Sequence, residues 1–177
     1  YPRIFAVAWE WVGYCQDQID LAQTIAFVQE YQQVAPLKIG ELWALPNMLR
    51  IRLLERLART VAKLTGLDSP KSMSRIPSQF ASPALANETI VANCILSLRL
   101  LSATDWKDFF EETSRVEQIL GNDPAQIYAD MDFDTRNNYR SVIEDLARHS
   151  KHSEEQVALA AVEFARNVED KISTRKT

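Results

Sequence analysis

The chain has 177 residues, a net charge of -4 and 46% hydrophobic residues, enough for one domain with a core or for two small helical lobes. This composition excludes a disordered chain, and the mild charge argues against nucleic-acid binding as the main role. Only 4 glycines are present, which argues against a β-rich fold with many tight turns.

The sequence begins at Tyr1 rather than at Met, so we expect a piece of a longer polypeptide or a processed product. It has no recognisable signal peptide, and no segment reaches the roughly 20 apolar residues that a membrane span needs. Cys15 and Cys94 lie among apolar residues, which favours two buried free thiols in a reducing compartment. A disulfide between these two cysteines is the alternative.

Three helices are predicted in the first 66 residues. The first covers residues 4–14, and the second begins after Asp20, whose carboxylate suits an N-cap, and ends near Pro36. The third covers residues 39–64. Because Pro46 lies inside it, we expect a kink or a restart near that position.

Two stripes run along the second half of the third predicted helix. An apolar stripe, which predicts a core-facing side, consists of Leu49, Leu53, Leu57, Val61 and Leu64. A basic stripe consists of Arg52, Arg56, Arg59 and Lys63. The basic stripe fits either a solvated face or a surface for lipid phosphates or an acidic partner domain. Gly66 then suits a left-handed C-terminal residue.

Residues 67–86 contain three prolines and five serines, which predicts a linker or loop. This segment divides the chain into an N-terminal helical part, 1–66, and a C-terminal helical part, 87–177, which we expect to form one composite domain. Helices are predicted over 88–101, 105–120, 123–129 and 135–150, and a last one begins after Ser153. The predicted fold is therefore all-α, a multi-helix bundle of about seven helices with one kinked at Pro46.

The last two helices carry apolar residues and capping signals. In the helix over 135–150, we expect an inward face made of Tyr139, Val142, Ile143 and Leu146. Ser153 and Gln156 have the spacing of a capping box at the start of the last helix. The apolar residues of that last helix are Val157, Ala160, Ala161, Phe164 and Val168.

Two patterns of metal-binding residue types are present, and both are better explained without a metal. His149 and His152 lie across a helix end with no third ligand, so two solvated histidines are favoured. Asp130, Asp132 and Asp134 resemble the DxD motif of many glycosyltransferases. We favour helix capping, by the second or third of these aspartates, because the chain shows no strands to build a nucleotide site.

Catalytic constellations are not apparent. Glu111 and Glu112 point about 100° apart on a helix, so they cannot act as a pair across a sugar. There is no Gly-rich phosphate loop and no nucleophile motif, so we predict no catalytic, metal-binding or cofactor-binding residue. Trp106, beside Phe109 and Phe110, is the aromatic residue that best suits sugar stacking, although core packing is the usual role of tryptophan.

Five motifs in order along the chain resemble the cyclic β-1,2-glucan synthases, which are very large, multi-spanning inner-membrane proteins of bacteria. The motifs are Tyr1-Pro2-Arg3-Ile4, Gly40-Glu41-Leu42-Trp43-Ala44-Leu45-Pro46-x-Met48-Leu49-Arg50, Ser97-Leu98-Arg99-Leu100-Leu101-Ser102, Asp105-Trp106-x-x-Phe109-Phe110-Glu111, and Asp123-Pro124 through Met131-Asp132-Phe133-x-Thr135-Arg136-x-x-Tyr139-Arg140. The resemblance covers most of the chain outside residues 67–86, where this sequence is shorter than expected for the family.

The resemblance implies a parent enzyme that polymerises glucose from UDP-glucose through β-1,2 links and closes the ring, with a phosphorylase-like C-terminal part. The matched region precedes the glycosyltransferase module of the family, so no catalytic residue is carried over. We therefore expect an accessory, non-catalytic helical domain on the cytoplasmic side of the inner membrane. Its expected partners are other domains of the same polypeptide.

Two alternatives remain open: a carbohydrate-binding module for the growing β-1,2-glucan, and an independent enzyme. Trp106, Phe109 and Tyr128 are the candidates for sugar contacts. Arg136 and Arg140 lie one helical turn apart, and could bind acidic side chains of a neighbouring module or within this fold. We expect no cofactor, no nucleic-acid partner and no membrane span in this segment.

Overall fold

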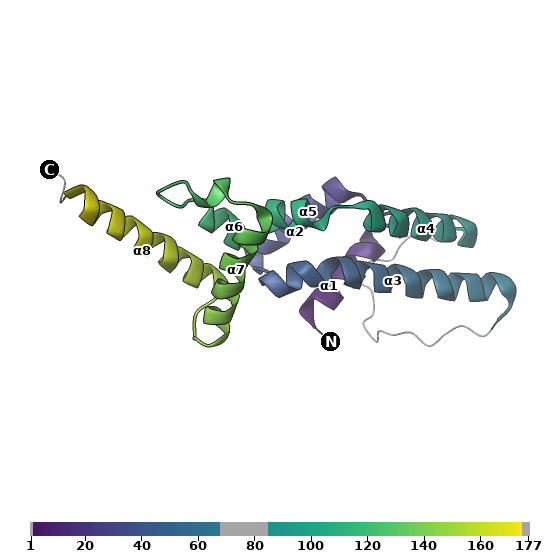
Figure 1. The fold of residues 1–177 in the computed structure, drawn as a ribbon. Coiled ribbons are helices and arrows are strands. Elements are labelled where there is room, and N and C mark those ends of the chain that lie inside the picture. The colour runs from purple at the N-terminus through teal and green to yellow at the C-terminus, as the bar shows by residue number, and fades with distance from the viewer. Residues whose placement is uncertain (1, 68–84, 175–177) are drawn as a thin grey trace. The chain divides into compact units, whose positions relative to one another are not determined.

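The computed structural model describes residues 2–67 and 85–174, with side chains up to Val168. These residues form eight α-helices, a short 3-10 helix and no strand, which confirms the predicted all-α fold (Figure 1). The helices are α1 (Arg3–Tyr14), α2 (Leu21–Val34), α3 (Ile39–Thr65), α4 (Asn87–Ala103), α5 (Trp106–Thr113), α6 (Arg115–Leu120), α7 (Phe133–Arg148) and α8 (Glu154–Thr174). In this described part of the chain, no helix combines the length and apolarity required to cross a membrane.

The described residues group into two compact units. The first unit contains the residues up to Tyr31 and those from Gly40 to Trp106. The second contains Gln32–Ile39 and the residues from Lys107 onward. Most of the predicted linker, 68–84, lies outside the described residues.

In the first unit, α1 is an amphipathic helix whose apolar side is buried against α2. Trp11 stacks on Phe27 with ring centres 4.2 Å apart, and its indole N–H donates a hydrogen bond to Thr24 Oγ1 at 3.0 Å. Val12, which follows Trp11, and Val28, which follows Phe27, are fully buried. The predicted N-cap of α2 is confirmed, because Asp20 Oδ1 accepts a hydrogen bond from the amide of Gln23 at 2.8 Å.

The turn between α1 and α2 has an unusual backbone. Gln16 and Asp17 are consecutive non-glycine residues in the left-handed region, with φ of 52° and 64°. Side chains of α4 hold the turn: the Ser97 hydroxyl donates to the Asp17 carbonyl at 2.8 Å and accepts from the Ile19 amide at 2.8 Å. Because each left-handed residue costs roughly 1–2 kcal/mol, these contacts are needed to fix the conformation.

Helix α3 continues through Pro46, so the helix does not restart there. The kink expected at this proline stays a prediction. Only the first part of its predicted apolar stripe is buried. Leu49 and Leu53 are fully buried, whereas Val61 and Leu64 are exposed. Gly66 follows with φ of 69°, as predicted for a left-handed helix end.

The predicted helix over 105–120 is two helices, α5 and α6. Ser114 separates them, because its hydroxyl accepts a hydrogen bond from the amide of Glu117 at 3.2 Å and begins a new helix. The predicted helix over 123–129 is also wrong. The Asp123 carboxylate accepts the amide of Ile127 at 3.0 Å and holds a turn, and only Tyr128–Asp130 forms a 3-10 helix.

Capping predictions for α7 and α8 are confirmed. Asp132 Oδ1 accepts the amide of Thr135 at 2.9 Å, which is the capping role favoured over a metal site. At the start of α8, the Ser153 hydroxyl accepts the Gln156 amide at 3.2 Å, and the Gln156 side chain accepts the Ser153 amide at 2.9 Å. Helix α8 contacts both α6 and α7.

The predicted inward face of α7 is largely wrong. Ile143 is buried, but Tyr139, Val142 and Leu146 are 51%, 57% and 53% exposed. The inward side of α7 is instead centred on Arg140, which is fully buried. A paired arginine therefore occupies the core position that periodicity assigned to apolar side chains.

Candidate functional site

The densest group of charged side chains in the second unit surrounds Glu117 of α6. Its Oε2 lies 2.5 Å from Nη1 of Arg140 and accepts a hydrogen bond from the hydroxyl of Tyr128 at 2.8 Å. Its Oε1 lies 2.6 Å from Nη1 of Arg136. One carboxylate thus holds two guanidinium groups and one phenol.

Helix geometry explains why two arginines reach the same carboxylate. Arg136 and Arg140 are four residues apart on α7, so their side chains leave the same face. Arg136 also binds Glu111 of α5, with Nη2 and Oε1 2.5 Å apart. The network therefore joins α5, α6 and α7 within the second unit.

Arg140 is enclosed by aromatic rings as well as by the carboxylate. The centre of its guanidinium lies 4.6 Å from the ring centre of Phe133 and 5.0 Å from that of Phe110. Both distances suit cation–π attraction, which is stronger where water is excluded. Burial, together with the hydrogen bond to Glu117, raises the pKa of Tyr128, so its hydroxyl stays protonated and acts as a donor.

The structure brings together three of the five predicted site residues. Arg136 and Arg140 bind an acidic side chain within this fold, which was one of the two predicted options, and Tyr128 shares that side chain. Phe109 is in the same unit but is buried. Trp106 belongs to the first unit, where its indole N–H donates to a main-chain carbonyl of α4 at 3.0 Å.

Sequence reasoning did not single out Glu117, the centre of this network. A signal was present, because Ser114 and Glu117 have the spacing of a capping box. That pattern could have placed the start of α6. It could not have indicated that Glu117 turns toward two arginines about 20 residues further along the chain.

Within the described residues, the other candidate groups are engaged locally or exposed. His149 and His152 are both exposed, and no set of three or more metal-ligating side chains is positioned for an ion in this part of the chain. In the basic stripe, Arg56 binds Asp17 at 3.0 Å. Arg52 binds Glu55 at 2.9 Å and lies over a tryptophan ring, so half of this stripe is used inside the first unit.

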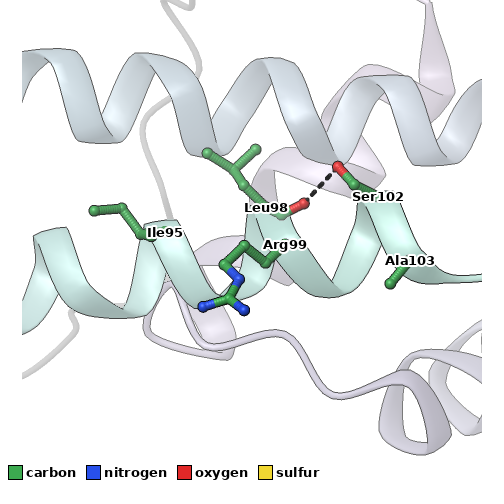
Figure 2. Close-up of a pocket in the computed structure, with 5 residues that line it drawn as sticks. All are labelled: Ile95, Leu98, Arg99, Ser102 and Ala103. Atoms are coloured by element: carbon green, nitrogen blue, oxygen red, sulfur yellow. Dashed lines mark hydrogen bonds between the residues drawn. The ribbon is translucent and has the colours of Figure 1, made fainter.

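A shallow hollow lies on the surface of α4 (Figure 2). Its lining residues are Ile95, Leu98, Arg99, Ser102 and Ala103. Figure 2 shows that the Ser102 hydroxyl turns back to the Leu98 carbonyl, a hydrogen bond of 2.8 Å, while the Arg99 side chain extends from the helix. The lining offers an apolar floor and one guanidinium, without a carboxylate or histidine among these residues.

Exposed apolar side chains form a second surface feature, the α7 apolar stripe, defined as Tyr139, Val142 and Leu146. At 100° per residue these side chains share one flank of α7, about 130° around the helix from Arg140. The Tyr139 ring also makes an edge contact with the Tyr128 ring, with centres 6.1 Å apart. A stripe of this kind suits contact with another apolar surface.

The chain is similar in sequence to a known protein. The chain is 30% identical over 231 residues to the protein named cyclic beta-(1,2)-glucan synthase NdvB of Rhizobium meliloti strain 1021. The match covers 92% of this chain but only 8% of the relative, and it is longer than the chain itself, so the relative has additional residues inside the matched region. No family model and no solved structure matches the chain.

Proposed function

Because this chain is related to the cyclic β-(1,2)-glucan synthase family, we propose that it is an accessory, non-catalytic helical domain of such an enzyme. The parent would be a membrane-bound glycosyltransferase that polymerises glucose from UDP-glucose and has a phosphorylase-like C-terminal part. The domain would lie on the cytoplasmic side of the bacterial inner membrane. Its role would be to bind another module of the same polypeptide.

The observation that carries this proposal is the α7 apolar stripe. Three apolar side chains, each more than half exposed, lie on one flank of a helix whose opposite flank is polar. Leaving these side chains in water costs free energy that an apolar partner surface would recover, at about 25 cal/mol per Å² of apolar surface buried.

The charged side chains of the second unit support a structural rather than a chemical role. A general acid or base needs a proton-transfer position open to substrate. Glu117 instead holds two guanidinium groups and a phenol, and Glu111 holds Arg136. These carboxylates fix helices α5, α6 and α7 together, and so they give the stripe a rigid base.

Binding between the 177-residue chain and the remainder of the parent synthase tests the proposal. We expect the wild-type chain to bind when added in trans and to restore glucan synthesis to a parent from which this segment is deleted. The variant Leu146→Lys should bind at least about tenfold more weakly, because it places a charge in an apolar contact. The matched control is Leu96→Lys on α4, which has similar exposure.

Two results would overturn this assignment. One is a deletion of the segment that leaves cyclic glucan synthesis at its full rate. The other is equal loss of binding in the Leu146→Lys and Leu96→Lys variants, which would show that the α7 apolar stripe is not the contact.

A carbohydrate-binding module for the growing β-1,2-glucan is the second candidate. Its support is the half-exposed ring of Tyr139, an aromatic side chain of the kind that stacks on sugars, beside Tyr128. Titration of linear β-1,2-glucan, followed by amide chemical shifts, tests it. We expect shifts centred on Tyr139, and no change at millimolar sugar would remove this candidate.

A further inference from the structure

Beyond Val162, helix α8 has no buried side chain among those described, which end at Val168. Of the side chains described on this helix, Glu154, Ala158 and Val162 are buried, and they all lie in its first half. From Glu163 to Val168 every side chain is exposed or half-exposed, although the helix continues to Thr174 (Figure 1). A helical segment this short is marginally stable in water, so a packing partner would stabilise it.

An apolar seam runs along this helix; its first residue, Val157, is partly buried, and the other three are exposed. The seam, which we call the α8 seam, is defined as Val157, Ala161, Phe164 and Val168, and Phe164 is 72% exposed. Its spacing of four, three and four residues is that of the core positions of a coiled coil. At 100° per residue, the seam lies about 90° around the helix from the buried residues, so the same helix can bind a second partner.

The α8 seam is complementary to itself when two copies run antiparallel. A two-fold axis midway between Ala161 and Phe164 places the Phe164 ring of each copy over the small Ala161 of the other. The same axis places Val157 opposite Val168. Two-fold interfaces require this reciprocity, in which residue i meets residue j and j meets i.

Charge placement agrees with the same pairing. Between Val157 and Val168 the charged side chains are Glu163 and Arg166, and both fall on the side of the helix opposite the seam. The pairing therefore buries no charge and sets no like charges against each other, which removes the main cost of bringing two identical surfaces together.

We propose that the α8 seam pairs with the α8 seam of a second copy of this chain, in antiparallel orientation, with Phe164 packed on Ala161 across a two-fold axis. Four side chains on one helix bury less surface than a standard protein interface. The resulting dimer is therefore weak, with a dissociation constant in the micromolar range.

The test is sedimentation equilibrium of the 177-residue chain at concentrations up to about 0.5 mM. At this concentration a dimer with a micromolar or weaker dissociation constant is detected. We expect the wild-type chain to become dimeric as concentration rises. Phe164→Lys should weaken the dimer at least about tenfold, and the matched control Leu159→Lys, on the opposite side of α8, should leave it unchanged. Circular dichroism of each variant separates loss of dimer from loss of fold.

Exchanging the large and small side chains at positions 164 and 161 tests whether these two positions face each other across the dimer. Ala161→Phe alone should weaken the dimer because two phenylalanines then meet, whereas Ala161→Phe combined with Phe164→Ala should restore it. A wild-type chain that stays monomeric throughout, or a Phe164→Lys variant that still dimerises, would overturn the proposal. Leu146→Lys should dimerise normally, so failure of the docking role and failure of this pairing give different results.

Discussion

Arg140 and Glu117 form an ion pair inside the second unit, with Nη1 of the guanidinium 2.5 Å from Oε2 of the carboxylate. Arg140 is fully buried, and its guanidinium lies near the rings of both Phe110 and Phe133. A charge in such a position is tolerated only while its partner is present, because the desolvation cost of the arginine is not otherwise offset. This relationship makes the second unit sensitive to single substitutions.

Replacing Glu117 by glutamine should strongly destabilise the fold. Glu117→Gln removes the negative charge from two arginines, one of them fully buried, and breaking such a pair costs about 3–5 kcal/mol. Urea unfolding followed by circular dichroism measures the change. The control is Glu144→Gln, which breaks a surface pair with Arg148 and should cost less than about 0.5 kcal/mol. Similar losses in both variants would contradict the role given to Glu117.

Removing the hydroxyl of Tyr128 should have a smaller effect. Tyr128→Phe deletes the donor to Glu117, and hydrogen bonds to charged groups contribute about 1.5–3 kcal/mol. The matched control is Tyr139→Phe, because the Tyr139 ring is half exposed and touches the same tyrosine edge to face. We expect the free energy of unfolding to fall in the first variant only. A thermal melt of both proteins is sufficient to decide this.

Ser97 should be required for the turn between α1 and α2. Ser97→Ala leaves the Ile19 amide and the Asp17 carbonyl without their buried partner, at about 1–3 kcal/mol for each unsatisfied group. Ser102→Ala on the same helix removes only an exposed hydroxyl that bonds to its own helix, so stability should be nearly unchanged. Amide hydrogen exchange at Ile19 gives a local measurement. An Ile19 amide equally protected in both variants would show that Ser97 does not hold the turn.

Both cysteines are free thiols, and they should be unreactive in the folded chain. The predicted burial is confirmed for Cys94, whereas Cys15 is only partly buried. Burial raises the pKa of Cys15 and of Cys94 to about 12, from 9.0, so both thiols stay neutral at pH 8. A thiol reagent should modify neither cysteine in the native state and both after unfolding in urea. Rapid modification of Cys94 in the native state would contradict this assignment.

Because of the same pKa shifts, the folded state should lose stability at alkaline pH. The unfolded chain releases its thiol protons near pH 9, whereas the folded chain holds them until about pH 12. The stabilising contribution is therefore complete below pH 9 and is lost as the pH rises from 9 to 12. Replacing both cysteines by alanine should remove this part of the pH dependence, which unfolding measurements between pH 8 and 11 would detect.

Local signals in the sequence were sufficient for most of the helices and for several of their first residues. Asp20 and Ser153 were identified as caps from residue type and spacing, and Asp132 was one of two candidates for the cap of α7; each accepts an amide at the start of its helix. The break at Ser114 was missed because the apolar pattern continues across it. The turn after Asp123 was missed because a proline after an acidic residue also begins many helices.

Helix α7 shows that local sequence signals do not predict which side of a helix faces the core. Along α7, apolar side chains and arginines both recur at helical spacing, so periodicity alone permits either set to face inward. Burial of apolar surface favours an inward face made of the apolar side chains. The arginines face inward instead because Glu117 on α6 is placed to bind them. The candidate site therefore depends on a residue that no pattern on α7 could reveal.

The sequence by itself determined an all-α chain, the caps that begin its helices and its resemblance to one enzyme family, because these depend on residues close together along the chain. Only the tertiary structure decided that Arg140 occupies the core and that Tyr139, Val142 and Leu146 face solvent. The physical reason is that a buried charge is stable only beside its counter-charge. Glu117, which supplies that counter-charge, lies on another helix, and its position is known only once the helices are packed.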